Sequence, residues 1–458
     1  MSIKVRSFGG VEGVTGSAHL LTIDNINILI DCGMFQGLEE DENYQPFGFI
    51  PASVDYLILT HSHIDHIGRI PLLVKQGFKG KIITTKPTYH LSRIMLLDAA
   101  NVMAEEYKVQ YKKALRRGKP EEAKKPLYDE DDVFLAMEFF KILLEYEEPY
   151  YITDNIRITF KDAAHILGSA FVEIKIKDKI IVFSGDLGTK EKLLLNSITY
   201  QDKADVVFIE STYGNRKHKS LQESIEEFKN AIIESFKDGG NIVIPTFALE
   251  RAQEILYLLK MMYEKGELPP CKVFLDSPLA IAATKIFLTF KKYLKKELQN
   301  KEDLFNFPYL HFTQSVEESR KINDIESGAI ILAGSGMCNG GRVKHHLKHN
   351  LWRKESSVIF VGYQAKGTLG RQIVDGAKYV KIYGEEIAVN AKIYTINGFS
   401  SHADQPTLLE WLSNIKGLEA VNIIHGEKEV MEAFKEKIKE ELKLNPHIVL
   451  KKETVYII

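Results

Sequence analysis

The sequence predicts an α/β protein with a mostly parallel sheet, and three observations support this fold class. From about residue 220 to 390, apolar strand-like runs alternate with helical patterns, which is typical of strands joined by crossover helices. Short strands separated by Gly, Asn and Asp turns fill the N-terminal stretch. The chain has 458 residues, 45% of them hydrophobic and 27% charged, which predicts a folded protein of two or three domains.

The first half combines strands with one long charged segment. A helix is predicted at residues 67–75, and residues 88–148 are expected to be long, charged and helical. Within that segment, residues 111–126 offer no clear apolar face. Residues 98–130 are either an oligomer contact or a surface flap, and the pattern does not choose between them. The predicted strands lie at residues 5–10, 18–23, 26–31, 54–60, 82–85, 156–160, 171–176, 180–186 and 206–210.

In the second half of the chain, predicted helices alternate with predicted strands. Helices are predicted at residues 221–237 and 249–265, and strands and a helix resume near residue 391. The predicted strands of this part lie at residues 241–245, 272–276, 329–333 and 358–362. This alternation predicts a second sheet whose strands are parallel.

Composition excludes several classes of protein. No run of 18 apolar residues occurs, so no transmembrane helix and no membrane partner are expected. The N-terminus lacks the apolar core of a signal peptide. Cys32, Cys271 and Cys338 are odd in number and far apart, which predicts a reducing, cytoplasmic location. The net charge of −2 means that a nucleic-acid substrate would need a local basic surface.

The most informative motif follows the strand at residues 54–60. His61, His63, Asp65 and His66 place four metal-ligand side chains within six residues. Imidazole and carboxylate suit zinc. A single tetrahedral ion could hardly use all four groups from so short a loop, so the motif predicts two ions.

Further ligand candidates end other predicted strands or lie in the loops just after them. Loops at one edge of a sheet converge in space, so distant residues can form one site. The candidates are Asp31, His165, Asp186, Glu210, His402 and His425.

These motifs together resemble the β-CASP group of metallo-β-lactamase-fold nucleases. This group includes the endonuclease subunit of the pre-mRNA 3′-end cleavage complex and its bacterial and archaeal relatives. His-x-His-x-Asp-His at residues 61–66 indicates the metallo-β-lactamase fold. Ile-Glu-Ser-Thr-Tyr-Gly at 209–214, Ser-Ser-His-Ala-Asp at 400–404 and His-Gly-Glu at 425–427 narrow the resemblance to β-CASP.

The resemblance implies a domain organisation. A metallo-β-lactamase αββα sandwich would comprise residues 1–205 and 393–458. An inserted β-CASP α/β domain, residues 206–392, would cap the metal site.

The resemblance also implies a ligand set of two Zn²⁺ per chain. His61, His63 and His165 would hold one ion, Asp65, His66 and His425 the other, and Asp186 would bridge them. Such a pair can share a hydroxide, lower its pKa toward ~7 and clamp the oxygens of a phosphoryl displacement. Manganese and iron remain open as alternatives to zinc.

Four residues receive catalytic roles. Asp65 belongs to this set as well as to the ligands, and Asp31 resembles an outer-shell carboxylate that orients a ligand. His402 would protonate the leaving oxygen or bind the scissile phosphate, and Glu210 would hold it and raise its pKa.

Substrate contacts are expected from two glycine-rich turns after predicted strands, at residues 334–342 and 362–371, and from one further arginine. Backbone N–H groups in such turns can bind phosphate, and arginine matches phosphate geometry. The predicted substrate-binding residues are Arg251, Ser335, Gly336, Gly340, Gly341, Arg342, Lys366, Thr368 and Arg371.

The predicted function is a zinc-dependent ribonuclease that cleaves single-stranded RNA, in RNA processing or decay, with the endo- or exonucleolytic mode left open. A DNA nuclease of the same fold and a small-molecule metallo-hydrolase remain as alternatives. His425 favours RNA as the substrate, because the corresponding motif of the DNA-repair relatives resembles one with Val at this position. Glu210, His402 and the inserted domain argue against a small-molecule hydrolase. A non-catalytic scaffold is disfavoured because every ligand position is filled. A homodimer and RNA-processing partners are expected only by resemblance.

The remaining histidines receive structural interpretations. His19 lies in a predicted strand and is expected to pack in the core. His345, His346 and His349 follow Arg342 at helical spacing and are expected on a solvated helix face, with a place along the RNA path as the alternative.

Overall fold

The computed structural model describes residues 2–457 and divides into two compact units. Unit 1 comprises Met1–Lys190, Ser197–Lys217 and His402–Ile458. Unit 2 comprises Glu191–Asn196 and His218–Ser401. Unit 2 is therefore inserted into the sequence of unit 1. The domain boundaries expected at residues 206 and 392 stay a prediction.

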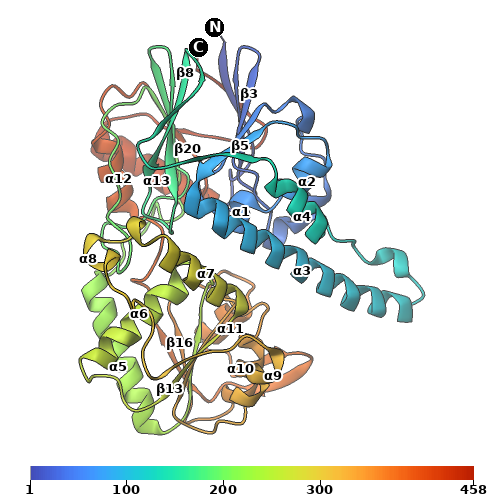
Figure 1. The fold of residues 1–458 in the computed structure, drawn as a ribbon, viewed down its shortest axis with the longest axis vertical. Coiled ribbons are helices and arrows are strands. Elements are labelled where there is room, and N and C mark those ends of the chain that lie inside the picture. Colours follow the sequence, from blue (N-terminus) through green and yellow to red (C-terminus); the bar gives the residue numbers. More distant parts are fainter. Residues whose placement is uncertain (1, 458) are drawn as a thin grey trace. The chain divides into compact units, whose positions relative to one another are not determined.

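Unit 1 contains two seven-stranded sheets (Figure 1). The first has the order β22-β1-β2-β3-β4-β5-β6, and the second β21-β20-β11-β10-β9-β8-β7. In the first sheet β3, β4, β5 and β6 are parallel, and in the second β10, β11, β20 and β21 are parallel. The strands of the first sheet are β1 (Ile3–Gly9), β2 (Ala18–Ile23), β3 (Ile26–Ile30), β4 (Tyr56–Ile58), β5 (Lys81–Thr85), β6 (Phe140–Leu144) and β22 (Thr454–Tyr456). Those of the second are β7 (Pro149–Thr153), β8 (Ile156–Asp162), β9 (Ala170–Ile176), β10 (Lys179–Phe183), β11 (Val206–Ile209), β20 (Ala420–Ile423) and β21 (His447–Ile448).

Three apolar clusters explain why the two sheets pack as a sandwich. The first joins side chains of both sheets, such as Ile28 and Ile174. The second joins the first sheet to helices α2, α3 and α4, and the third joins the second sheet to α12 and α13 through Trp411 and Phe434. Both faces of each sheet are buried. Successive residues of a strand point to opposite faces, so its sequence is a continuous apolar run. The helices of unit 1 are η1 (Gly37–Tyr44), η2 (Pro51–Ser53), α1 (Ile64–Ile67), α2 (Ile70–Lys75), α3 (Lys86–Arg116), η3 (Pro120–Glu122), α4 (Glu130–Met137), α12 (Gln405–Ser413) and α13 (Lys428–Leu442).

Unit 2 is built on a six-stranded sheet, β14-β13-β15-β12-β16-β19, in which every pairing is parallel. Its strands are β12 (Ile242–Pro245), β13 (Lys272–Asp276), β14 (Leu310–Phe312), β15 (Ala329–Ala333), β16 (Ser357–Phe360) and β19 (Lys392–Thr395), and β17 (Tyr379–Ile382) and β18 (Glu385–Ala388) form a hairpin. The helices are α5 (Leu221–Asp238), α6 (Arg251–Glu264), α7 (Pro278–Thr289), η4 (Lys291–Tyr293), α8 (Lys296–Gln299), α9 (Val316–Ile322), α10 (Val343–Asn350) and α11 (Leu369–Val374). The predicted fold class, α/β with a largely parallel sheet, is confirmed.

Two local predictions were wrong. Residues 140–144 form strand β6 instead of a helix, because this apolar run pairs with β5 at the edge of the first sheet; periodicity alone does not separate the two states in a short run. The helix expected at residues 67–75 is two short helices that divide at Gly68 and Arg69. Pro71, which has no N–H, lies in the first turn of the second helix, where a missing N–H costs no hydrogen bond.

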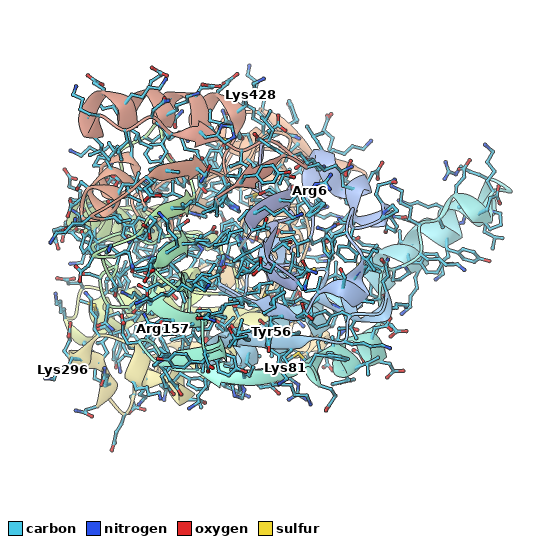
Figure 2. All side chains as sticks on the ribbon, turned by 90° about the horizontal axis from the view of Figure 1, so that it is seen from above. Arg6, Tyr56, Lys81, Arg157, Lys296 and Lys428 are labelled. Atoms are coloured by element: carbon cyan, nitrogen blue, oxygen red, sulfur yellow. The ribbon has the colours of Figure 1, made fainter. Side chains whose placement is uncertain are left out.

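Helix α3 extends well beyond the sheet on which it packs. Its first half buries Leu91, Leu96 and Ala100, whereas from Asn101 to its end only Ala114 is buried. Seen from above, the second half leaves the two sheets of unit 1 as a separate arm (Figure 2). Among residues 2–457, no helix combines the length and hydropathy that crossing a membrane requires.

Candidate metal centre

The predicted ligands follow the carboxyl ends of strands in both sheets of unit 1. In the first sheet, β3 leads into Asp31 and β4 leads into the His61 loop; these two strands are parallel neighbours. In the second sheet, β10, β11 and β20 are also parallel neighbours and lead into Asp186, Glu210 and His425. The parallel pairing brings the ends of these strands to one edge of each sheet.

One group of donors comprises His61, His63, His165 and Asp186. Nε2 of His61 lies 3.2 Å from Nδ1 of His63 and 3.4 Å from Oδ2 of Asp186. Nε2 of His165 lies 3.1 Å from the same His63 nitrogen and 3.6 Å from the same Asp186 oxygen. All four side chains thus present one atom to a common point.

A second group comprises Asp65, His66, Asp186 and His425. Nε2 of His66 lies 3.3 Å from Oδ1 of Asp186 and 3.6 Å from Oδ2 of Asp65. Nε2 of His425 lies 3.5 Å from Oδ1 of Asp186 and 3.9 Å from Oδ2 of Asp65. Asp186 therefore contributes one oxygen to each group.

The spacing of these atoms fits tetrahedral zinc. Zinc binds nitrogen and oxygen at ~2.0–2.2 Å, so its ligand atoms are about 3.3–3.6 Å apart along each edge of the tetrahedron. Most of the measured separations lie close to that range. In addition, Nε2 of His66 and Oδ1 of Asp186 are buried and make no hydrogen bond within residues 2–457, which is costly unless a further group binds them. The donor set fits two cations, and their binding here stays a prediction.

Asp31 contacts the ring nitrogen of His66 that does not belong to the second group. It accepts hydrogen bonds of 2.8 Å from both the backbone N–H and the hydroxyl of Thr60, and its Oδ2 lies 2.7 Å from Nδ1 of His66. A proton held on Nδ1 leaves the Nε2 lone pair of His66 facing the donor group. Asp31 thus orients His66 without belonging to either group.

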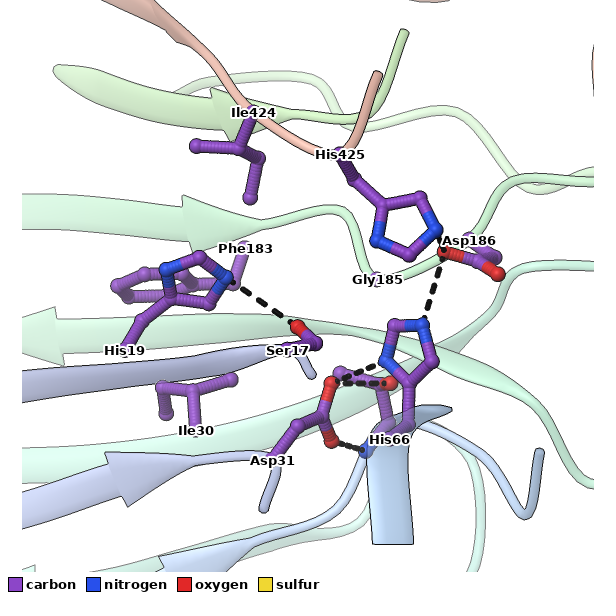
Figure 3. A pocket seen from close by; sticks show the side chains of 11 residues that line it. Ser17, His19, Ile30, Asp31, His66, Phe183, Gly185, Asp186, Ile424 and His425 are labelled. Atoms are coloured by element: carbon purple, nitrogen blue, oxygen red, sulfur yellow. Dashed lines mark hydrogen bonds and ion pairs between the residues drawn. The ribbon is translucent and has the colours of Figure 1, made fainter. Parts of the chain in front are cut away.

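A small cavity of about 10 Å³ lies beside the second group (Figure 3). Its lining includes His19, Ser17 and the buried His425, whose Nδ1 has no hydrogen-bond partner within the described residues. A space of this size holds about one water molecule, which could satisfy that nitrogen. His19 is buried, as predicted. Burial lowers its pKa to about 3, and its ring nitrogens lie 2.8 Å and 3.3 Å from the hydroxyls of Ser7 and Ser17.

Several turns at this site have left-handed backbone conformations. Asp31 has φ 60°, Ala164 beside His165 has φ 54°, and His425 itself has φ 49°. Such conformations are costly for non-glycine residues and concentrate at functional sites. Gly185, with φ 51°, allows Asp186 to approach, because a Cβ there would lie 2.7 Å from Cβ of Thr60.

Electrostatics favour the ligand forms of several side chains. Burial, together with the neighbouring His61, lowers the pKa of His63 well below its ordinary value. Burial, together with His402, likewise lowers the pKa of His165 well below its ordinary value. Burial would raise the pKa of Asp186, but the surrounding imidazoles outweigh it and hold that pKa well below normal. Neutral imidazole and ionised carboxylate are the forms that bind metals.

His402 lies beside the first group, in contact with a buried carboxylate. Its Nδ1 is 3.4 Å from Oε1 and Oε2 of Glu210 and 3.9 Å from Asp186. Glu210 is fixed in turn, because it accepts hydrogen bonds from the backbone N–H groups of Leu187 and Thr212. Burial would lower the pKa of His402, but Glu210 and Asp186 outweigh it and raise that pKa.

Two supporting residues were missed by the sequence analysis. The hydroxyl of Thr60 binds Asp31, and the hydroxyl of Ser169 accepts hydrogen bonds from the N–H groups of His165 and Ile166. Both lie within four residues of a predicted ligand. A hydroxyl so close in sequence to a ligand-bearing turn is the signal that could have identified them.

The predicted substrate-binding residues all belong to unit 2. The turn at residues 334–342 follows β15, and the turn at 362–371 follows β16 and ends in α11, whose N-cap is Thr368. Lys366 is exposed, and Arg371 is paired with Asp375. Arg251 is buried and pairs with Glu254. Ser335 Oγ accepts a hydrogen bond from the N–H of Gly340 within its own turn; Gly336 and Gly341 belong to the same turn.

Arg342 takes part in a buried network that the sequence did not predict. Its Nη1 lies 2.7 Å from Oδ1 of Asp276, and its guanidinium also donates to the carbonyls of Thr313 and Gln314. Nε2 of His346 lies 2.6 Å from Oδ2 of Asp276, and Ser319 donates to the same oxygen. The expectation of a solvated helix face is therefore wrong for His346, which is fully buried against this carboxylate.

Comparisons with known proteins cover most of the chain. The family model of the metallo-β-lactamase superfamily matches residues 11–149, that of the Beta-Casp domain matches 252–373, and one described as a Zn-dependent metallo-hydrolase RNA specificity domain matches 386–449. Ribonuclease TTHA0252 of Thermus thermophilus is 38% identical over 94% of this chain and 95% of its own.

Two archaeal relatives and one solved structure add to this picture. An RNase J-like protein of Methanocaldococcus jannaschii is 32% identical over 93% of both chains. The transcription termination factor FttA of Methanosarcina mazei is 31% identical over 100% of this chain and 72% of its own. A crystal structure of a protein of unknown function from Enterococcus faecalis superposes over 100% of both chains with a TM-score of 0.55 at 11% identity, a likeness of fold alone.

Proposed function

Because the chain belongs to the β-CASP family of metallo-β-lactamase-fold ribonucleases, we propose that it is a zinc-dependent ribonuclease. It hydrolyses phosphodiester bonds of single-stranded RNA, in RNA processing or decay. One observation carries the proposal: two donor groups of tetrahedral spacing share the two oxygens of Asp186. The RNA specificity domain matched at residues 386–449 supports RNA over DNA and small molecules.

Seven side chains of unit 1 would hold the two ions. His61, His63 and His165 would hold one ion, Asp65, His66 and His425 would hold the other, and Asp186 has an oxygen in each group. When bound, a pair of such cations activates water as a nucleophile and stabilises negative charge on a phosphate. Asp31 keeps His66 in the tautomer that ligation requires.

His402 and Glu210 form a third possible donor group with Asp186, but we assign His402 to the reacting phosphate because Glu210 favours its imidazolium form, which cannot bind metal. It is partly exposed, with 23% of its side chain accessible, whereas Glu210 beside it is buried. Glu210 favours the imidazolium form, so His402 can donate a proton to the oxygen that leaves when the phosphodiester breaks. A positioned acid of this kind contributes ~10²–10⁴-fold to the rate.

Unit 2 would supply contacts to the RNA backbone. The turns at residues 334–342 and 362–371 place backbone N–H groups and the exposed Lys366 after the carboxyl ends of β15 and β16. Phosphate binding by such turns needs no base-specific contact, so weak sequence preference is expected of this unit. Arg342 acts indirectly, because most of its donors are already bound to Asp276, Thr313 and Gln314.

The test is cleavage of end-labelled single-stranded RNA and of DNA of the same sequence, with and without a chelator. We expect RNA to be cut, DNA to be cut at least tenfold more slowly, and chelation to abolish both activities. Equal cleavage of DNA would favour the alternative DNA nuclease, and activity that survives chelation would contradict the proposal.

His402 gives a second test with a readout other than activity. His402→Ala should keep the metal content of the wild type, measured by elemental analysis, and lose ~10²–10⁴-fold in rate. His447→Ala is the matched control, because His447 is an exposed histidine of unit 1 that pairs with Glu453. Loss of metal from His402→Ala would overturn the role assigned to His402.

A further inference from the structure

One basic surface of unit 1 has no role in the metal centre. It comprises residues 108–125, the second half of α3 and the loop with η3 that follows it, and is called the basic arm below. The arm contains two acidic residues, whereas the whole chain has a net charge of −2. Its eight basic residues are all exposed: Lys108, Lys112, Lys113, Arg116, Arg117, Lys119, Lys124 and Lys125.

Four of these eight cations have no anionic partner among residues 2–457. Lys108 pairs with Glu105, Arg117 and Lys119 pair with Glu122, and Lys124 pairs with Asp41. Within residues 2–457, no carboxylate lies within ion-pair distance of the other four, Lys112, Lys113, Arg116 and Lys125. The arm therefore presents charge that a polyanion could neutralise.

Helix stability does not explain this arrangement. Cations in the last turn of a helix interact well with its dipole, which accounts for Lys113 and Arg116 but not for Lys112 or Lys125. Moreover, Lys112 and Arg116 are four residues apart, as are Lys113 and Arg117, and like charges at that spacing destabilise a helix. A bound chain of phosphates would remove this repulsion.

Two aromatic rings lie at the start of the basic arm, one just before it and one within it. The rings of Tyr107 and Tyr111 are 5.7 Å apart, and Tyr111 is 39% exposed. Single-stranded nucleic acids bind surfaces that combine basic side chains with aromatic faces on which bases stack. This combination favours RNA over a purely apolar partner.

The arm is joined to the metal centre by α3 itself. The helix begins directly after β5, where the hydroxyl of Thr85 donates to the carbonyl of Gly168 in the His165 loop. At 1.5 Å per residue, Lys108 lies ~33 Å and Arg116 ~45 Å along the helix from its first residue. Stacked nucleotides advance ~3.4 Å each, so about ten to thirteen nucleotides would span the distance from the start of α3 to the arm.

We propose that the basic arm binds the phosphate backbone of single-stranded RNA about ten to thirteen nucleotides from the bond that is cut. The arm then selects long RNA over short oligonucleotides, with no preference for sequence. This inference rests on the proposed ribonuclease function.

The test compares an arm variant with a matched control on RNAs of two lengths. The arm variant is Lys112→Gln, Lys113→Gln and Arg116→Gln, since glutamine keeps helix propensity while removing charge. The control is Lys435→Gln, Lys437→Gln and Lys439→Gln, which removes the same charge from α13 of the same unit. Cleavage is measured on 25-nucleotide and 6-nucleotide RNA across a range of salt concentrations.

We expect the arm variant to raise KM for the 25-nucleotide RNA at least tenfold and to leave cleavage of the 6-nucleotide RNA unchanged. Three lost phosphate contacts should also reduce the slope of log KM against log salt by ~2. The control variant should match the wild type. Equal effects on both lengths, or equal effects of both variants, would overturn the proposal.

Two further measurements separate the possible failures. If the wild type cuts neither RNA, the proposed function fails, and binding of the 25-nucleotide RNA by fluorescence anisotropy then tests the arm by itself. Unchanged RNA affinity of the arm variant overturns the proposal. If that result comes with a change of sedimentation coefficient, the arm instead contacts a second copy of the chain, with Val109 and Leu115 as its exposed apolar residues.

Discussion

At the scale of single residues, buried charges in this protein are held by several partners at once. Asp186 belongs to three donor groups, the third of them with Glu210 and His402. Asp31 binds Thr60 and His66, and Asp276 binds His346, Ser319 and Arg342. Buried charges persist only when they are paired and hydrogen-bonded. The three carboxylates differ in use: the first faces the candidate metal centre, the second orients one of its ligands, and the third fixes a turn in unit 2.

Asp276 gives a prediction about the stability of unit 2. Burial would raise its pKa, but hydrogen bonds from His346, Ser319 and Arg342 outweigh it and lower that pKa. Asp276→Asn should reduce the free energy of unfolding of unit 2 by about 3 kcal/mol at pH 7, because Arg342 loses its only charged partner among the described residues. Native-state hydrogen exchange of β13 and β15 measures this loss.

The pH dependence of that loss has a definite sign. Because the folded pKa is lowered, the contribution of Asp276 is fully present above the unfolded value of ~3.9 and is lost as pH falls through the folded pKa. The difference in the free energy of unfolding between the wild type and Asp276→Asn should therefore become smaller below pH ~4. Asp375→Asn, which removes an exposed partner of Arg371, should change stability by less than ~0.5 kcal/mol. If Asp375→Asn lowered the free energy of unfolding as much as Asp276→Asn, burial would not explain the effect of Asp276.

At the scale of elements, much of the candidate site could be predicted because its residues lie in short motifs at strand ends. The end of β4 lies within eight residues of His61, His63, Asp65 and His66, and so local a motif can be recognised without knowledge of the tertiary fold. Strand β6 could not be predicted, because its pairing with β5 decides its conformation. The burial of His346 was missed for the same reason: its partner Asp276 is seventy positions away.

The junction of β5 and α3 leads to a prediction at this scale. The hydroxyl of Thr85 both caps α3 at Thr88 and donates to the carbonyl of Gly168 near His165. Thr85→Ala should cost about 1 kcal/mol in thermal unfolding and accelerate hydrogen exchange both at the start of α3 and in the His165 loop. Thr85→Ser keeps the hydroxyl and should behave like the wild type. Faster exchange in only one of the two segments would show that the junction does not couple them.

At the scale of the whole molecule, unit 1 is completed only when the chain returns after unit 2. Strand β20 pairs with β11, and β22 pairs with β1, across more than two hundred positions of sequence. The returning segment contributes both His402 and His425. Periodicity could indicate these strands but not their partners, because pairing depends on contacts distant in sequence. The return of the chain to the first domain after the inserted domain was predicted from the family resemblance, not from the periodicity of apolar residues.

The central claim is that seven side chains around Asp186 hold two cations that RNA cleavage requires. The most direct measurement is the metal content of the purified protein by elemental analysis, together with its RNA cleavage rate, for the wild type and for His63→Ala and His425→Ala. We predict about two zinc ions per wild-type chain, about one in each variant, and loss of cleavage in both. A wild-type protein that holds one ion or none after zinc is supplied, or a His425→Ala variant that keeps both ions and its activity, would contradict the account.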